Sequence, residues 1–402
     1  MRKAIAIALT TVMMFAAFSM LGTNAAATSE IHVYPGDSIQ AAVDSASPGD
    51  TVIVHAGEYH QSVIFGPEDS GITLKGMEEA ILDGTPPADT GTTLGVNAIT
   101  IQAGASEITI KGFEIRDYSG PGSGQGNGIQ AWNDGTSDIT IEDNVIHSNS
   151  WNAILVGNEG TGLHEGWKIE DNVVYGNGFY SVEITNGRDC KIEGNSVVGG
   201  IAGILVQSRN TIPESGMFSS GDIVVEDNEV SEAWYGVYVI ALASGPTPPF
   251  DPIPGAWSIL ENVEVSGNEI FDNTYFGLYA WGYLSGLVQD SSFIENDVHD
   301  NGLYHGIVLN NADDSIVAEN QVYGHGYDGI ALYGASSGNE VSENDASNNG
   351  RYGISVRGGS SENTISENTA LSNVMYDLHW DGTGTGNTWE ENTYRTKSPN
   401  IP

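Results

Sequence analysis

Aromatic, amide and charged side chains recur two positions apart in a series of short apolar segments along the chain. The set comprises Trp132, Gln207, Tyr238, Tyr279, Trp281, Asn310, Tyr333, Arg357 and His379, with His305 beside it. Aromatic faces pack against the C–H faces of sugar rings, and amide and guanidinium groups hydrogen-bond to hydroxyl groups. Together these residue types predict a surface that binds a carbohydrate. The alternative is an aromatic ladder that only stabilises an exposed sheet.

A second set of candidate functional side chains is acidic. An aspartate or glutamate directly precedes an asparagine in eight of ten repeated units, and the last five of these units are consecutive. Like charges stacked ~5 Å apart repel by about 0.8 kcal/mol per pair even at the dielectric constant of water. We therefore predict bound cations, with Ca²⁺ as the extracellular candidate, and the candidate ligands are Asp189, Glu295, Glu319 and Glu343. The alternative is a solvated face, because no compact calcium-binding loop is present.

The asparagine that follows these acids defines an internal repeat. It occurs at Asn144, Asn172, Asn195, Asn228, Asn268, Asn296, Asn320, Asn344, Asn368 and Asn392, and the last four intervals are each 24 residues. Each unit alternates apolar and polar residues as a short strand does, and Asn or Gly marks its corners. A repeat of this length without a long helical segment predicts a parallel β-helix whose asparagines form an internal hydrogen-bonded ladder. With coils about 4.8 Å apart, the stack is a rod of about 50 Å.

Two further features complete the predicted rod. A glycine precedes the apolar pair in most units, and we expect it to give the backbone the freedom that the second corner needs. A short amphipathic helix over residues 39–46, capped by Asp37 or Ser38, is expected to cover the N-terminal end.

The N-terminus and the composition place the protein outside the cell. Residues 1–27 have the basic start, apolar run and small-residue end of a signal peptide, the alternative being an uncleaved anchor. Removing this segment takes away Arg2 and Lys3 and leaves 11 basic against 53 acidic residues, a formal charge of −42. We expect a secreted or cell-surface protein with no membrane insertion after signal cleavage, and a monomer.

Charge and cysteine content exclude several classes of protein. So few basic residues cannot build the cationic face that nucleic acid requires. Cys190 is the single cysteine, which excludes internal disulfides and a cysteine-rich zinc site. The only lysines between the signal and the C-terminal tail are Lys75, Lys111, Lys168 and Lys191, a composition typical of a salt-adapted, halophilic protein.

The longer repeat units carry insertions that leave the rod at one corner. They cover residues 158–165, 208–221 and 241–258, and we expect them to stand side by side as one wall of a groove. The basic residues nearest this wall are Arg188 and Arg209, with Glu183 close to them.

The opening coils resemble a known superfamily. The segments at 48–54, 56–59, 72–76 and 81–84 are similar to the first coils of the right-handed parallel β-helix repeat superfamily, and the resemblance covers roughly residues 31–396. It implies an all-β fold, a single-stranded right-handed parallel β-helix (solenoid) over residues 28–402 with a short N-terminal capping helix. The superfamily contains pectate- and alginate-lyase-like enzymes, polysaccharide epimerases and periplasmic copper-binding proteins.

The resemblance also implies an activity. Lyases of this superfamily typically use an arginine or lysine as the base at C5 of a sugar, with Ca²⁺ neutralising the uronate carboxylate. Here Arg209 or Arg188 would be that base, with Glu183 as a further catalytic candidate. We therefore expect first a Ca²⁺-dependent lyase that cleaves an extracellular, uronate-containing polysaccharide by β-elimination.

Two other functions remain open. The same aromatic surface suits a non-catalytic carbohydrate-binding or structural protein at the cell surface or in a matrix. The segment at 376–381 resembles the Tyr/Asp/His cluster of mannuronan epimerases, and Arg357 is one coil away, so a polysaccharide C5-epimerase is the third candidate.

Overall fold

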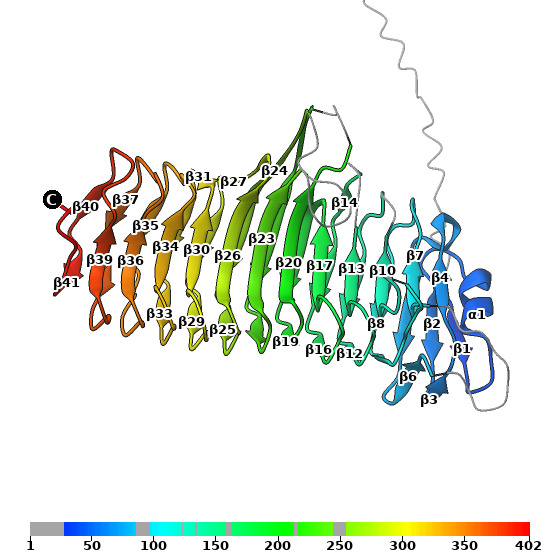
Figure 1. Ribbon diagram of the computed structural model, residues 1–402. Coiled ribbons are helices and arrows are strands. Elements are labelled where there is room, and N and C mark those ends of the chain that lie inside the picture. The colour runs from blue at the N-terminus through cyan, green and yellow to red at the C-terminus, as the bar shows by residue number, and fades with distance from the viewer. Residues whose placement is uncertain are drawn as a thin grey trace, which may run out of the picture.

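The computed structural model describes residues 28–85, 96–122, 124–132, 135–157, 162–212, 216–243 and 255–402, so the predicted signal peptide lies outside the described residues. Its strands stack as successive coils of a parallel solenoid, from helix α1 (Ile39–Ser45) at one end to strand β41 (Thr393–Tyr394) at the other (Figure 1). This confirms the all-β solenoid with a short capping helix. No helix in the described part of the chain has the length and apolar character needed to cross a membrane.

Three long sheets run along the rod. The groove sheet has 12 strands and provides the candidate site described below. Its strands are β4 (Val63–Phe65), β7 (Ile99–Ile101), β10 (Ile129–Ala131), β13 (Ile154–Val156), β17 (Val182–Thr185), β20 (Ala202–Arg209), β23 (Tyr235–Leu242), β26 (Phe276–Tyr283), β30 (Ile307–Asn310), β34 (Ile330–Tyr333), β36 (Tyr352–Val356) and β39 (Tyr376–Trp380).

The other two sheets close each coil. The 17-stranded sheet consists of β1 (Glu30–Val33), β2 (Thr51–Val54), β5 (Thr73–Gly76), β8 (Thr109–Lys111), β11 (Thr140–Glu142), β14 (His164–Glu165), β15 (Lys168–Glu170), β18 (Gly187–Glu193), β21 (Gly216–Glu226), β24 (Ala256–Ser266), β27 (Gly286–Gln289), β28 (Ser292–Ile294), β31 (Ala312–Asp313), β32 (Ile316–Ala318), β35 (Glu340–Ser342), β37 (Thr364–Ser366) and β40 (Thr388–Glu390). The 10-stranded sheet consists of β3 (Gly57–Tyr59), β6 (Ala80–Asp83), β9 (Glu114–Arg116), β12 (Val145–His147), β16 (Val173–Tyr175), β19 (Ser196–Val198), β22 (Glu229–Ser231), β25 (Glu269–Phe271), β29 (Asp297–His299) and β33 (Gln321–Tyr323). A short pair, β38 (Thr369–Ala370) with β41, continues beyond it, and a 3₁₀ turn, η1, covers Pro67–Asp69.

The predicted asparagine ladder runs through the interior from Asn144 to Asn392. Each side-chain amide donates to the Oδ1 of the next asparagine at 2.8 to 3.1 Å. The same Oδ1 accepts the backbone N–H of the preceding coil, as for Asn320 and Asn344 at 3.0 Å. The buried amides therefore satisfy one another and the corner backbone where no water reaches. Aliphatic side chains fill the remaining interior as one continuous core.

The backbone explains part of the acidic pattern. The residue before each ladder asparagine has a left-handed conformation, with φ of 57° at Glu295, 58° at Glu319 and 56° at Glu343. Where this residue is not acidic it is glycine, as at Gly194 and Gly267, both with φ of 66°. The position thus selects short, flexible or polar residues for the corner. Repulsion between neighbouring carboxylates therefore acts at positions where the left-handed backbone already restricts the residue type.

The repeated glycines before the groove-sheet strands have a different role from the predicted one. Gly236 and Gly353 do not have positive φ angles, so conformational freedom is not what they supply. A Cβ added to Gly353 would lie 2.6 Å from the Asn373 amide nitrogen and 2.6 Å from the carbonyl oxygen of Asp377. These glycines are required because adjacent coils pass too closely for any side chain.

Both ends of the core are covered. Ser38 caps helix α1 by accepting from the Ala41 N–H at 3.1 Å, and Ile39 and Val43 are buried against the first coils. At the other end the tail crosses the last coil, held by Asp377, which accepts the backbone N–H groups of Arg395 and Thr396 at 2.9 Å. Ile401 is 5% exposed and joins the core.

Candidate functional site

The outer face of the groove sheet carries the two predicted columns of side chains. Tyr238 lies opposite Leu205 and Tyr279 in the strand register, and the same column continues through the neighbouring strands. The second column contains Gln207, Ile240, Trp281, Asn310 and Tyr333 in sequence. The register confirms that these residues are stacked neighbours along the rod.

A third column on this face escaped sequence reasoning. It lies just before the repeated glycine, or before Ala153, Ser181 and Asp377 in the coils that lack this glycine. The column consists of Asn152, Tyr180, Ala202, Tyr235, Phe276, His305, Asp328, Tyr352 and Tyr376. The alternation of two fails here, because the glycine adds one residue between this column and the next outward position. A search for polar residues directly before the glycine would have found Asp328 together with His305.

The densest polar group on the face is the Asp328 cluster, defined by His305, Asp328, Tyr333, Ser355 and Arg357. The Asp328 carboxylate is fully buried, and its Oδ2 accepts from Arg357 at 2.6 Å, Ser355 at 2.8 Å and the Tyr333 hydroxyl at 3.3 Å. The sheet places these side chains together because β30, β34 and β36 are consecutive in it. A buried carboxylate with these partners is fixed in one position.

The hydrogen bonds of this cluster determine which atoms of His305 and Tyr333 carry a hydrogen and where each hydrogen points. The Asp328 backbone N–H donates to His305 Nδ1 at 3.3 Å, so Nδ1 accepts and Nε2 carries the hydrogen. Nε2 lies 3.0 Å from the Tyr333 oxygen, whose own hydrogen then points to Asp328. Burial lowers the pKa of His305 to about 4, so the ring is neutral at pH 7. The Tyr333 hydroxyl therefore lies between a neutral imidazole donor and a carboxylate acceptor.

Arg351 adds a second guanidinium group at this position. It stacks between the rings of Tyr327 and Tyr352, 4.6 and 4.4 Å from their centroids. Its Nε is 4.0 Å from Asp328 Oδ1, and its one hydrogen bond to the described residues is 3.3 Å long, to the Tyr352 hydroxyl. Since its side chain is 22% exposed, Arg351 keeps donors that face solvent and can bind an anionic group.

His379 lies beside the Asp328 cluster. Its ring stacks on Tyr352 with a centroid distance of 4.0 Å. Burial, with the nearby charge of Arg357, lowers the pKa of His379. The structure therefore groups four residues named from the sequence, which are His305, Tyr333, Arg357 and His379.

A second polar group, the Glu183 cluster, lies five strands away towards the N-terminus. Glu183 is only 7% exposed and accepts from the Asn152 amide at 2.7 Å, while the Thr185 hydroxyl lies 3.0 Å from its Oε1 and 3.1 Å from Gln207. Burial raises the pKa of Glu183 to about 7, and the nearby positive charge of Arg209 acts in the opposite direction. The predicted pair Glu183 and Arg209 thus lies together on the groove face.

Aromatic rings fill the space between these two clusters. The aromatic platform is made up of Tyr235, Tyr238, Phe276, Tyr279, Trp281 and Tyr283, and neighbouring ring centroids are 4.2 to 5.6 Å apart. Asn310 continues the platform by donating to the Tyr279 hydroxyl at 2.8 Å. Half-buried rings with polar edges form the kind of floor on which sugar rings pack.

The N-terminal end of the same face is hollowed. An open pocket of about 590 Å³ lies over β7 and β10 and is lined by Trp132, Gln130, Asn97, Gln102 and Gln125 among others. Its polar side chains are four amides, the Thr100 hydroxyl and the Trp132 indole, which form hydrogen bonds without carrying charge. The predicted contact residue Trp132 therefore belongs to this pocket.

The groove has a wall on the side of the insertions. Strands β21 and β24 pair in register from Gly216 and Ala256 to Glu226 and Ser266, and they rise beside the rod (Figure 1). This confirms that the insertions of neighbouring coils stand side by side, although residues 158–161, 213–215 and 244–254 lie outside the described part. On the opposite corner, exposed aromatic side chains at Trp234, Tyr304 and Tyr327 border the face.

Arg188 is separated from the groove. It lies in β18 of the 17-stranded sheet, and its guanidinium donates to the Ser219 carbonyl at 3.4 Å. Arg209 lies in β20 of the groove sheet, and the corner at Asn186 separates β17 of that sheet from β18.

The predicted metal ligands do not converge. Asp189, Glu295, Glu319 and Glu343 are exposed side chains at left-handed corner positions. Within the described ranges, the acidic and histidine side chains that come together as a possible metal group are Glu58, His60 and Asp83, with ligand atoms within 4.8 Å of one another.

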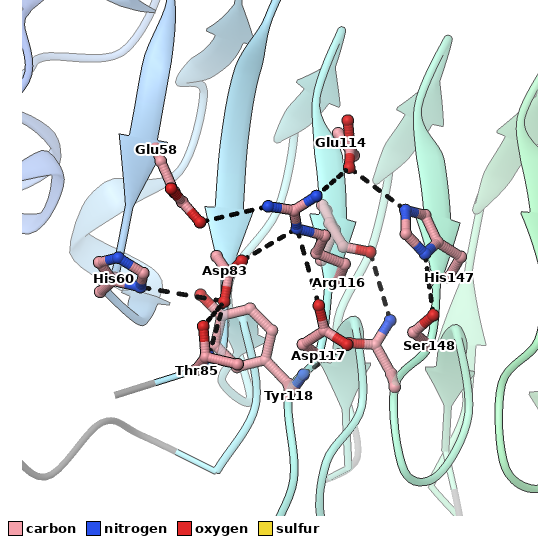
Figure 2. A network of polar contacts seen from close by, with 12 residues as sticks. Glu58, His60, Asp83, Thr85, Glu114, Arg116, Asp117, Tyr118, His147 and Ser148 are labelled. Carbon is pink, nitrogen blue, oxygen red and sulfur yellow. Dashed lines mark hydrogen bonds and ion pairs between the residues drawn. The ribbon is translucent and has the colours of Figure 1, made fainter. Parts of the chain in front are cut away.

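That group lies against Arg116, whose positive charge offsets part of the negative charge of the carboxylates (Figure 2). The guanidinium of Arg116 lies 2.9 Å from Asp83, 3.2 Å from Glu58 and 3.0 Å from Glu114. The network joins β3, β6 and β9 on the 10-stranded sheet, away from the groove. Its geometry indicates an ionic bridge between the first coils.

Comparisons with known proteins agree with this architecture. The family model described as "Right handed beta helix region" matches residues 97–247 and 203–394. The structure is similar to the A-module of mannuronan C-5 epimerase AlgE4 from Azotobacter vinelandii, with 16% identity, a TM-score of 0.58 and coverage of 89% of this chain and 95% of that chain. It is also similar to the A-module of mannuronan C-5 epimerase AlgE6 from the same organism, with 15% identity, a TM-score of 0.51 and coverage of 90% and 94%. No curated protein matches the chain.

Proposed function

The chain belongs to the family of right-handed β-helix proteins, and from that premise we propose that it is a secreted carbohydrate-active enzyme. Its substrate is a uronate-containing polysaccharide that lies along the groove sheet, and its reaction is β-elimination. The observation that carries the proposal is the Tyr333 hydroxyl, held between His305 and the buried Asp328 and flanked by two arginines. Acidic and basic side chains with shifted pKa values, gathered on a face that suits sugars, are typical of a catalytic centre.

The first step of the proposed reaction is binding of the uronate carboxylate. Arg351 has donors that face solvent, so it can hold this carboxylate in a charge-assisted hydrogen bond. Neutralising the carboxylate makes the C5 hydrogen more acidic, because the charge that develops at C5 spreads onto the carboxylate oxygens. The Arg357 guanidinium, 2.6 Å from Asp328, keeps the cluster rigid while the substrate binds.

The second step moves one proton from C5 to O4. Tyr333 takes the proton from C5 while its own proton passes to Asp328, 3.3 Å away. The C5–H electron pair forms the C4=C5 double bond, and the C4–O4 bond breaks. Asp328 then returns its proton to Tyr333, and Tyr333 protonates the leaving O4. His305 holds the Tyr333 oxygen in place throughout.

A C5-epimerase, the third candidate from the sequence, becomes the second candidate here. Epimerisation begins with the same removal of the C5 proton, and the two structural neighbours are mannuronan C-5 epimerases. The specific observation in its favour is His379, an imidazole that burial keeps neutral beside the same arginine. As a neutral imidazole it can take the C5 proton from one face while the Tyr333 hydroxyl gives a proton to C5 from the other, provided that the C4–O4 bond stays intact; the two groups then recover their protonation states by exchange with solvent.

The deciding experiment compares Tyr333→Phe with Arg209→Ala. We expect Tyr333→Phe to reduce the rate by about a hundredfold or more, as loss of a general acid–base group does, with a matched Tyr323→Phe control on the 10-stranded sheet unchanged. Ultraviolet absorbance of the unsaturated product detects elimination, and deuterium uptake at C5 from D₂O detects epimerisation. If Arg209→Ala abolished activity and Tyr333→Phe did not, the base would be Arg209 at the Glu183 cluster, as the superfamily resemblance implies.

A further inference from the structure

The positions of the basic residues along the rod indicate what kind of polysaccharide the groove accepts. All 11 lysines and arginines beyond residue 27 fall within the described ranges, so their distribution is fully known. Eight of them lie on other sheets or in the C-terminal tail: Lys75, Lys111, Arg116, Lys168, Arg188, Lys191, Arg395 and Lys397. Three remain for a face that extends over 12 strands.

Each of these three arginines already has a carboxylate near it. Arg209 lies beside Glu183, while Arg351 and Arg357 share the single carboxylate of Asp328. Among the described residues of the face, the Asp328 cluster is therefore the place where two guanidinium groups lie together, and the next carboxylate, Asp381, is on the following coil and accepts from the Gly358 N–H. The aromatic platform and the N-terminal pocket are lined by rings and amides.

A polymer made only of uronates would be poorly matched to this face. A pyranose unit is comparable in length with the ~4.8 Å coil spacing, so roughly one carboxylate would lie on each coil. Moving a carboxylate out of water without a partner costs several kcal/mol. The formal charge of −42 that remains after removal of residues 1–27 adds long-range repulsion for every further negative charge.

We propose that the natural substrate is a heteroglycan in which single uronate residues alternate with neutral sugars. The inference rests on the proposed function, since it places the reacting uronate at Arg351. Neutral sugars then occupy the aromatic platform, where their C–H faces pack on Tyr238, Tyr279 and Trp281, and the amide pocket around Trp132. The groove selects its substrate by the spacing of negative charge along the polymer.

The test measures binding separately from chemistry. Calorimetry with the Tyr333→Phe variant compares oligosaccharides of equal length at low ionic strength, using hyaluronan and unsulfated chondroitin against polygalacturonate and alginate. We expect tenfold or tighter binding of an alternating oligosaccharide, and roughly a tenfold loss of that binding in Arg351→Gln, since one charge-assisted hydrogen bond is removed. Arg188→Gln, outside the groove, is the matched control.

The possible outcomes separate the inference from the proposed function. Equal or tighter binding of polygalacturonate or alginate, with or without Ca²⁺, overturns the inference, and so does the absence of binding to all four polymers. If the alternating oligosaccharides bind preferentially but the wild-type protein neither cleaves them nor exchanges their C5 hydrogen, the inference holds and the proposed enzymatic function fails.

Discussion

At the scale of single residues, burial sets the chemistry of the groove. Glu183 is surrounded by the Asn152 amide, the Thr185 hydroxyl and apolar neighbours, and burial raises its pKa to about 7. Burial lowers the pKa of His305, because the neutral form of a base is its deprotonated form. At pH 7 burial therefore keeps His305 neutral and leaves Glu183 partly protonated.

The Glu183 carboxyl should make stability depend on pH. Its pKa is higher in the folded protein than in the unfolded chain, so its protonated form stabilises the fold below pH 4.5 and this contribution is lost as pH rises towards 7. The full effect is about 3 kcal/mol for a shift of this size. We expect Glu183→Gln to unfold at a higher temperature than wild type at pH 8 and at nearly the same temperature at pH 4.5.

Thermal unfolding followed by circular dichroism at both pH values checks this expectation. Glu229→Gln, which changes an exposed glutamate in β22, is the matched control and should not alter the pH dependence. A pH dependence in Glu183→Gln that equals that of wild type would contradict the assignment.

At the scale of structural elements, the ladders decide how the coils stack. His325 occupies a ladder position between Asn301 and Asn349, and its backbone N–H donates to Asn349 Oδ1 at 3.4 Å. Its Nε2 lies 3.0 Å from the Val298 carbonyl, while its buried Nδ1 has no hydrogen-bond partner in the described part of the chain. One imidazole thus interrupts a column of amides.

This interruption predicts a weakness in acid. Burial lowers the pKa of His325 to about 4, so the stability present above pH 6.5 is lost as pH falls towards 4, by about 3 kcal/mol at most. We expect His325→Asn to complete the ladder and to remove this part of the acid destabilisation. Urea unfolding at pH 7 and pH 4.5 measures it, with His32→Asn at an exposed position as control. A variant that loses stability with acid as steeply as wild type would show that His325 does not titrate in this way.

The sequence predicts those elements whose residues recur at one constant interval. The asparagine ladder and two outward columns follow from the 24-residue interval and the alternation of strands. The column with Asp328 and His305 does not, because each glycine shifts the alternation by one residue. Arg188 and Arg209 are close to the same predicted wall, yet a corner separates their sheets, and no periodicity in the sequence marks that corner.

At the scale of the whole molecule, negative charge dominates. The chain has 53 acidic and 13 basic residues, and the acidic corners form columns along the rod. Self-repulsion of this size opposes the compact state and is screened by salt. Adaptation to an environment rich in ions and Ca²⁺ binding at the corners both remain proposals.

Salt should raise the temperature of unfolding. We expect a continuous rise with NaCl, because screening weakens the repulsion between corner carboxylates. If Ca²⁺ binds the column, CaCl₂ at the same ionic strength gives a larger rise, and the double variant Glu319→Gln/Glu343→Gln loses the difference. Equal curves for the two salts would assign the column to solvated surface charge.

The last coils share a constant interval of residues, so the rod can change length by whole coils. Each coil between Asn296 and Asn392 begins and ends at equivalent corners, so the internal ladder would remain continuous if one complete unit were duplicated or lost. A change of another size within a strand would bring a corner against a strand, whereas the longer coils accommodate extra residues as insertions that leave the ladder unbroken. The length of the groove therefore changes in steps of about 4.8 Å. Gain or loss of whole repeat units would alter the number of sugars that the groove holds without altering the core.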